Sequence, residues 1–474
     1  MASRLASSSP RRVGRSRTWG PPWLALGAAL AIAAGLRAIG LRYGLPFGNL
    51  LNPDEQSIVS RAWAMVHGSG GDPHWFDYPT LLMYVVAPFE SWQPTPGYLA
   101  ARIVVVVFGI AAVAATWWLG RRAYGTLAGA VGAAAVAVDT TAVAYSHAAV
   151  TDIPLVAAAT AALALMVAGR IELAGLAAGV ATSFKYPGVF LLAPLVVAAW
   201  GRWRRLAAGL VLALGAFLAG SPFVAAHPAQ AWGDASRVQR LARDGWLGFE
   251  HDHWAGIAFL QRLWDGLGPV LIVCAAGVLV AAWRRRRSDL ILLAFVAVYF
   301  VDLLTLRAHF DRYALPLVAP LAVLAGRLRP LAPVTLLLLV VPLTWSIRND
   351  VRLTRTDTRV VAQRWIVRHV PEDSMVAVES STPALPPGYS VVGLALPGPG
   401  VPFDPDRNVA RLRHEGVAYV VVTGAVADRV LAARDRYPRE SRFYDDLRRR
   451  TRRVYYGAPG RALTGPWVAV YRLS

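Results

Sequence analysis

The sequence contains one cysteine, one lysine and few acidic residues. Cys274 cannot pair within the chain, so no internal disulfide stabilises the fold. Only 16% of the residues are charged, whereas 55% are hydrophobic and the mean hydropathy is +0.42. A soluble domain of this size would need far more polar surface. The composition therefore excludes an ordinary soluble protein and indicates a membrane protein.

The net charge of +20 could suggest a nucleic-acid partner. The arginines, however, lie in short clusters between apolar stretches, at residues 121–122, 202–205, 284–287 and 327–329. Loops with such clusters stay on the cytoplasmic side of a membrane. Membrane topology therefore explains the charge, and we expect no nucleic acid as a partner.

Several apolar stretches approach or exceed the ~20 residues that a helix needs to cross a ~30 Å hydrocarbon layer. The first follows a basic N-terminus and has no clean small-residue cleavage site after it, so we interpret it as a retained anchor rather than a signal peptide. If every arginine cluster is cytoplasmic, an even number of crossings must separate neighbouring clusters. This rule predicts about eleven transmembrane helices, at residues 22–41, 99–120, 127–144, 153–168, 173–184, 189–200, 206–224, 266–283, 290–306, 313–326 and 331–347.

The remaining apolar stretch, residues 81–89, is short and follows Pro79, which predicts a helix in the outer interface. We expect a cytoplasmic N-terminus (1–20), a transmembrane domain (21–348) and a small extracytoplasmic α/β domain (349–474). In that last domain, residue patterns predict helices at 358–370, 405–415 and 425–437 and strands at 375–379, 417–423 and 467–473. It contains no nucleotide-binding glycine fingerprint.

The predicted topology places polar residues from distant parts of the sequence on the outer side of the membrane. They are Asp54, Glu55, Asp77, Asp152, Lys185, Arg240, His251, His309 and Arg312. We therefore expect these side chains to gather at one membrane face.

Lys185 is the only lysine among 49 basic residues, and it lies within the apolar residues 173–200. A cation at that depth costs about 2.5–3.5 kcal/mol on insertion scales, which implies a partner. It could be a snorkelling lysine at the tip of a helical hairpin. We favour a counter-charge for an anion such as a lipid phosphate, because intramembrane charges are functional by default.

The outer acids have both structural and chemical interpretations. Asp54 and Glu55 follow Pro53, as suits the first turn of a helix, and Asp152 could be a helix cap. Transfer from a lipid phosphate, however, needs a carboxylate that takes the acceptor's proton and cations that stabilise the departing phosphate. The outer acids and bases match that division of labour.

The aromatic and basic residues after residue 306 are similarly open to two interpretations. His309, Arg312 and Tyr313 lie just outside a predicted span. They could be interfacial anchors, or they could bind phosphate or sugar.

Five short motifs follow one another along residues 20–330: Asn52-Pro53-Asp54-Glu55, Phe76-Asp77-Tyr78-Pro79, His147 to Thr151-Asp152, Thr182-Ser183-Phe184-Lys185-Tyr186-Pro187-Gly188 and Arg312-Tyr313-Ala314-Leu315-Pro316-Leu317. In order and in predicted side, they resemble motifs of the C-class, integral-membrane glycosyltransferases that use polyprenyl-phosphate sugars. The most similar members are the protein O-mannosyltransferases and the lipid A aminoarabinose transferases. Two positions differ from the family pattern, because Tyr78 stands where a lysine is usual and His147 where an arginine is common.

The resemblance implies that Asp54 is the catalytic base and that Glu55 supports it. It also implies that Lys185 and Arg312 hold the lipid phosphate. Together with the outer-side pattern, it predicts a set of substrate-binding residues: Asp77, Tyr78, His147, Asp152, Lys185, Arg240, His309, Arg312 and Tyr313.

We therefore predict an inverting glycosyltransferase of a bacterial inner (plasma) membrane. It would move a sugar from a polyprenyl-phosphate donor to an extracytoplasmic protein, lipid or glycan. No cofactor is expected to be required, and a divalent metal is not indicated, although His251, Asp252 and His253 could bind one. The alternatives are a transporter or lipid flippase and a non-catalytic lipid-binding scaffold. Transporters usually show internal repeats and a midplane site, and we find no repeat.

Overall fold

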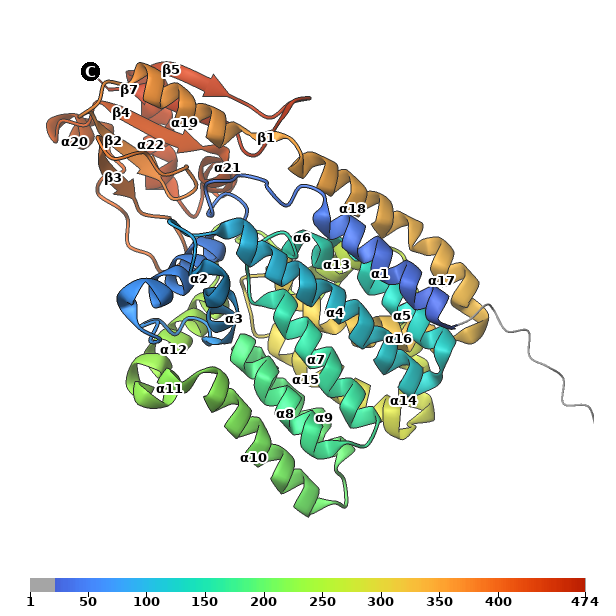
Figure 1. Cartoon of the computed structure of the whole chain (residues 1–474). Coiled ribbons are helices and arrows are strands. Elements are labelled where there is room, and N and C mark those ends of the chain that lie inside the picture. Colours follow the sequence, from blue (N-terminus) through green and yellow to red (C-terminus); the bar gives the residue numbers. More distant parts are fainter. Residues whose placement is uncertain (1–21, 474) are drawn as a thin grey trace, which may run out of the picture.

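The computed structural model describes residues 22–473, which form a helical bundle and a small sheet domain packed at one end of it (Figure 1). The basic N-terminus predicted at residues 1–20 lies outside the described residues. A mostly helical fold with a small C-terminal sheet domain is as the sequence predicted.

The helices of the bundle follow the predicted spans closely. Those on the spans are α1 (Pro22–Ala38), α4 (Tyr98–Tyr124), α5 (Thr126–Val138), α6 (Thr140–Tyr145), α7 (Asp152–Val167), α8 (Ile171–Phe184), η2 (Tyr186–Leu191), α9 (Leu192–Ala198), α10 (Trp203–Gly220), α11 (Pro222–Ala226), α14 (Val270–Arg284), α15 (Arg287–Leu303), η3 (Asp311–Ala314), α16 (Leu315–Gly326), η4 (Arg329–Leu331), α17 (Ala332–Leu338) and α18 (Val340–Leu353). Those between the spans are α2 (Pro53–Ala64), η1 (Met65–Ser69), α3 (Leu81–Glu90), α12 (Pro228–Asp244) and α13 (Ala255–Leu267).

Fewer than eleven of these helices are both long enough and apolar enough to cross a membrane by themselves. Within residues 22–473, three are long and apolar enough: Tyr98–Tyr124, Trp203–Gly220 and Arg329–Leu353. A fourth results if Ala255–Leu267 and Val270–Arg284, bent by 118°, count as one broken span. These apolar helices support a membrane protein, while the count of eleven stays a prediction.

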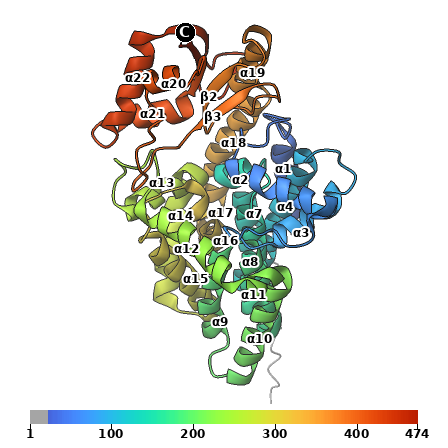
Figure 2. The same cartoon turned by 90° about the vertical axis from the view of Figure 1, so that its left-hand side faces the viewer.

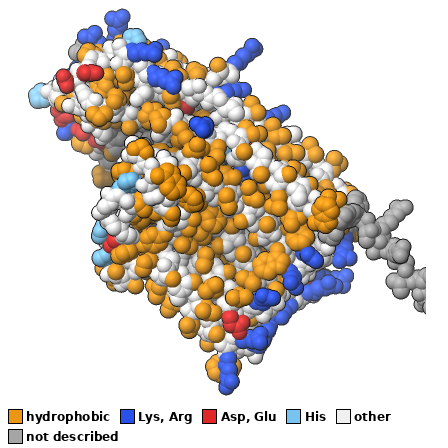
Figure 3. Space-filling view, in the orientation of Figure 1, with side chains coloured by type: hydrophobic (Ala, Val, Ile, Leu, Met, Phe, Trp, Pro, Cys, Tyr) orange, Lys and Arg blue, Asp and Glu red, His pale blue; other side chains and the backbone are white. Residues whose placement is uncertain are grey.

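The surface of the bundle is consistent with a membrane environment. Hydrophobic side chains cover the middle of the face in Figure 3, and arginine side chains lie at the lower end of the bundle and over the sheet domain at the upper end. Helix α3 has ten residues and is about 15 Å long. It is too short to cross a ~30 Å hydrocarbon layer, in agreement with the interfacial helix predicted there.

Small residues allow α8 and α10 to approach closely. A Cβ atom added to Gly175 would overlap with the backbone oxygen of Gly209, and one added to Gly179 would overlap with that of Ala213. Helices in membranes associate largely through such close backbone packing. This contact fixes α8, and with it the chain that follows at Lys185.

We expect Gly175→Ala to lower the unfolding temperature of the purified protein, because the added methyl group overpacks the α8–α10 contact by about 1–3 kcal/mol. Gly215→Ala, on α10, is the matched control, since nothing lies within 4 Å of a Cβ atom at that position. Thermal unfolding in detergent measures both. Equal unfolding temperatures for the two variants would contradict the packing described.

The C-terminal domain contains a five-stranded sheet of order β3-β2-β4-β7-β5. Its strands are β2 (Met375–Glu379), β3 (Ser390–Leu394), β4 (Tyr419–Thr423), β5 (Arg452–Gly457) and β7 (Val468–Arg472). The strands β3, β2 and β4 are parallel, and β7 runs antiparallel to β4 and β5. A separate pair is formed by β1 (Thr356–Asp357) and β6 (Leu463–Thr464).

Helices cover both faces of this sheet. Val421 of β4 packs with α19 (Thr358–His369), whereas Val420 and Val422 pack with the helices of the other face. Those helices are α20 (Val409–His414), α21 (Gly424–Ala432) and α22 (Pro438–Arg450). The six predicted elements of this domain are present, and β3, β5 and α22 are elements that the sequence patterns did not predict.

A buried ion pair of the sheet domain is hydrogen-bonded to the first loop of the bundle. Arg359 Nη2 lies 2.7 Å from Asp357 Oδ2 and donates a second hydrogen bond of 2.7 Å to the carbonyl oxygen of Leu50. Tyr43 also donates a hydrogen bond to Asp357. The domain is thereby held beside the loop that leads into α2, as Figure 2 shows from a second direction.

Candidate active site

Asp54 is positioned by the first turn of α2. The side-chain oxygen of Asn52 accepts a hydrogen bond of 2.9 Å from the backbone N–H of Asp54. Pro53 occupies the start of the helix, where its missing N–H is not needed. These residues fix where α2 begins and therefore where the Asp54 carboxylate lies.

The Asp54 carboxylate binds two groups from distant parts of the chain. Its Oδ2 atom accepts a hydrogen bond of 2.8 Å from Tyr78 Oη and lies 2.5 Å from Arg312 Nη1. Burial alone would raise the pKa of Asp54, but the charge of Arg312 and the hydrogen bond from Tyr78 hold this pKa below its usual value. Asp54 is therefore ionised at neutral pH and can accept a proton.

Lys185 forms the second ion pair of the site. It follows the last residue of α8, and its Nζ atom lies 2.5 Å from Oδ1 of Asp152, the first residue of α7. The two side chains are only 9% and 4% exposed. The partner that Lys185 requires at this depth is thus Asp152.

Two tyrosine rings join the ion pairs into one cluster. Lys185 Nζ lies 5.6 Å from the ring centre of Tyr78 and 5.3 Å from that of Tyr313, within the range of cation–π attraction. Arg312 lies 5.8 Å from the Tyr313 ring. We call Asp54, Tyr78, Asp152, Lys185, Arg312 and Tyr313 the charged cluster.

The charged cluster retains capacity to bind an anion. Among the described residues, the buried Nε atom of Arg312 has no hydrogen-bond partner. A buried donor without a partner is unusual in a native protein and needs an explanation. A bound anionic group would satisfy it.

Glu55 lies behind the charged cluster rather than in it. Its side chain is completely buried, and its two oxygens accept hydrogen bonds of 2.7 Å from Arg102 of α4. Oε1 also accepts a hydrogen bond of 2.9 Å from the backbone N–H of Ala149. Glu55 therefore joins α2 to α4 and to the loop before α7, which positions its neighbour Asp54.

Asp77 lies at the edge of the site. It forms an ion pair with Arg237 of α12, and burial raises its pKa. The backbone of the preceding residue, Phe76, is held on both sides, because its N–H donates to Asp234 and its carbonyl oxygen accepts from Tyr186 Oη, each at 2.9 Å. The motif around Asp77 thus places Tyr78 in the charged cluster while Asp77 itself faces α12.

Besides Asp77, three predicted substrate-binding residues lie outside the charged cluster. His147 is fully buried between the carbonyl oxygens of Val143 and Ile39, each at 2.8 Å. Arg240 is exposed on α12. His309 is buried and contacts Asp252 at 3.1 Å. The structure therefore does not bring these three residues into the charged cluster, and their gathering at one membrane face stays a prediction.

The residues considered for metal binding do not form a group. Asp252 contacts His309 as described, whereas His251 Nε2 lies 3.5 Å from Asp435 in the sheet domain. Among the described residues, a different set could hold an ion: Asp72, His74 and His227.

Sequence reasoning missed Arg102 and Asp311. Asp311 accepts a hydrogen bond of 2.7 Å from Tyr145 and caps the backbone N–H of Arg312 at 2.8 Å. Arg102 lies inside a predicted apolar span, so the rule that a charge at membrane depth has a partner could have found it.

Known proteins resemble most of the chain. A family model described as Glycosyltransferase family 87 matches residues 75–306. Apo ArnT from Cupriavidus metallidurans is 16% identical, with a TM-score of 0.59 and coverage of 94% of this chain and 97% of that one. ArnT bound to undecaprenyl phosphate is 15% identical, with a TM-score of 0.54 and the same coverage. No curated protein matches the sequence.

A third solved structure has the same fold. The oligosaccharyltransferase AglB from Archaeoglobus fulgidus, in complex with an inhibitory peptide and a dolichol-phosphate, is 13% identical with a TM-score of 0.56. The match covers 96% of this chain and 75% of that one. The family model indicates that the protein is a glycosyltransferase. The resemblance to C-class, integral-membrane glycosyltransferases that the motifs predicted is confirmed.

Removing Arg102 should destabilise the protein strongly. Arg102→Met leaves the Glu55 carboxylate buried without a counter-charge, and breaking a buried pair in this way costs about 3–5 kcal/mol. Arg205→Met is the control, because Arg205 and Glu172 form an exposed pair at 3.6 Å. We expect a large fall in unfolding temperature for Arg102→Met only. A similar fall in both variants would show that Glu55 is not held as described.

Proposed function

We propose that the protein transfers a sugar from a polyprenyl-phosphate donor to an acceptor outside the cytoplasm. The solved structures of ArnT with undecaprenyl phosphate and of AglB with a dolichol-phosphate support a lipid-phosphate partner. The observation that carries the proposal is the charged cluster, in which two carboxylates, Asp54 and Asp152, meet two cations. The family model favours this reaction over a transporter, flippase or scaffold.

Asp54 would act as the general base. It takes the proton of the acceptor as the acceptor's heteroatom attacks the anomeric carbon of the sugar. The bond between that carbon and the phosphate oxygen breaks, and its electrons leave with the phosphate. Because phosphate is a good leaving group, no general acid is needed. A single displacement of this kind inverts the anomeric centre.

Lys185 and Arg312 would hold the phosphate. Before reaction each cation is paired with a carboxylate, Asp152 or Asp54. When Asp54 takes the proton, its negative charge disappears and Arg312 loses its counter-charge. At the same moment the leaving phosphate gains negative charge, which Arg312 can then stabilise. Proton uptake and phosphate departure are thereby coupled through one arginine.

The arginine clusters support an orientation in which the charged cluster and the sheet domain face the outside of a plasma membrane. Residues 1–20 would then be cytoplasmic, 21–348 would form the membrane domain, and 349–474 would form the extracytoplasmic domain.

Asp54→Asn should reduce transfer at least about 100-fold, which is the lower range for loss of a general base. Release of undecaprenyl phosphate from synthetic undecaprenyl-phosphate sugars measures transfer, with cell-envelope material as the acceptor. Asp265→Asn is the control, because Asp265 is an exposed acid on α13. Because the pKa of Asp54 is low, Asp54 stays ionised as the pH falls below neutral. Wild-type turnover should therefore stay constant until the pH falls through that pKa. Equal turnover of wild type and Asp54→Asn would refute Asp54 as the base.

Membrane-impermeant maleimide should label Arg240→Cys in intact cells. It should label Arg204→Cys only after permeabilisation, because the predicted topology places the two exposed arginines on opposite sides. The native Cys274 is buried and provides an unlabelled background. The reverse pattern of labelling would invert the proposed orientation.

A further inference from the structure

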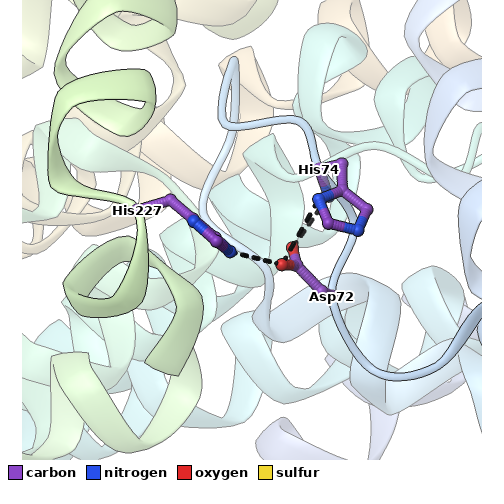
Figure 4. A group of neighbouring side chains, drawn as sticks. All are labelled: Asp72, His74 and His227. Atoms are coloured by element: carbon purple, nitrogen blue, oxygen red, sulfur yellow. Dashed lines mark hydrogen bonds and ion pairs between the residues drawn. The ribbon is translucent and has the colours of Figure 1, made fainter.

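Asp72, His74 and His227 form a group at the edge of the site that the transfer reaction does not use (Figure 4). Asp72 and His74 lie in the loop after η1, and His227 precedes the first residue of α12. Asp72 Oδ2 lies 2.8 Å from His227 Nε2 and 3.4 Å from His74 Nδ1. The three side chains therefore point one oxygen and two nitrogens at a common point.

Hydrogen bonding explains only part of this arrangement. The His227 contact has the length of a hydrogen bond, but the 3.4 Å contact of His74 is longer than an ordinary N–H···O bond. In addition, His74 has a φ of +48°, in the left-handed region that non-glycine residues rarely adopt. Such a conformation persists where its surroundings demand it. Here it turns the His74 ring toward Asp72.

The 3.4 Å separation of His74 and Asp72 also fits two ligands of one metal ion. Around a tetrahedral Zn²⁺ with ligands at about 2.0–2.1 Å, neighbouring ligand atoms lie about 3.3–3.4 Å apart. The ligand atoms of Asp72, His74 and His227 all lie within 4.8 Å of one another. Two imidazole nitrogens and a carboxylate oxygen suit Zn²⁺ better than Mg²⁺ or Ca²⁺, which prefer oxygen ligands.

An ion could reach this site from solvent. The His74 and His227 side chains are 70% and 42% exposed, whereas that of Asp72 is 12% exposed. Three protein ligands leave a fourth position for water. We propose that Asp72, His74 and His227 bind one Zn²⁺ ion.

The site would fasten the first outer loop to α12. Two hydrogen bonds of 2.9 Å already join these segments, from Gln230 to the carbonyl oxygen of His74 and from the Phe76 N–H to Asp234. The same loop carries Tyr78 into the charged cluster. A bound ion would therefore be a positioning element for Tyr78 and would take no direct part in transfer. The inference goes beyond the proposed function and does not depend on it.

Zinc binding to the full-length protein tests the proposal. The protein is purified in detergent without a polyhistidine tag, and Zn²⁺ is added alone as the probe. We expect about one bound Zn²⁺ per chain by elemental analysis, and a higher unfolding temperature with Zn²⁺ than with a chelator. His227→Ala and Asp72→Asn should each weaken Zn²⁺ binding at least about tenfold, the size of effect seen even when an outer-shell partner of a metal ligand is lost.

His253→Ala is the matched control, because His253 is an exposed histidine outside this group. It should bind Zn²⁺ as the wild type does. Absence of Zn²⁺ binding by the wild type would overturn the proposal, as would equal weakening in His253→Ala or unchanged binding in His227→Ala. None of these measurements uses a sugar donor. Failure of the metal site would thus leave the proposed transfer reaction intact, and failure of transfer would leave the metal site intact.

Discussion

The structure depends on the pairing of charges at a depth where an unpaired charge is costly. Lys185 can stand at the end of the apolar helix α8 because Asp152, the first residue of the preceding helix α7, lies 2.5 Å away. Arg312 and Asp54 meet the same requirement. Because each partner comes from a different element, the pairs also hold α2, α7, α8 and η3 together. The electrostatic requirement of a buried charge thereby brings distant segments to one place.

Other contacts around these ion pairs fix the positions of the charged cluster's residues and take no direct part in the reaction. The Glu55–Arg102 pair fixes the start of α2, and the small residues of α8 and α10 fix the approach to Lys185. The loop before Tyr78 is held by α12 and by Tyr186. A reaction that needs one acid and two cations within a few ångströms depends on this support.

The sequence predicted the parts of the fold that rest on composition and periodicity. Long apolar stretches predicted the helices of the bundle, and β-branched runs such as residues 417–423 predicted central strands of the sheet domain. The amphipathic α13 was missed because it is not uniformly apolar, and α22 because it is rich in charge and follows a predicted helix closely. The short strand β3 lies between proline-rich loops and has an exposed face, so its pattern was weak.

For the site, the sequence predicted which residues carry chemistry better than where they lie. Lys185 was found because it is the one lysine, and Tyr78 through its motif. His147 and His309 share the predicted outer side, but topology gives neither the depth of a residue nor the helix face on which it lies. Both point into other buried networks. For the same reason the sequence did not predict that Asp77 pairs with Arg237 of α12 or that Arg240 is exposed on that helix.

The central claim is that the charged cluster receives the phosphate of a polyprenyl lipid. An experimentally determined structure of the protein with bound undecaprenyl phosphate tests it most directly. The account predicts phosphate density within hydrogen-bond distance of both Lys185 and Arg312, with Arg312 Nε among the donors. Phosphate density elsewhere, with both cations still bound only to their carboxylates, would contradict it.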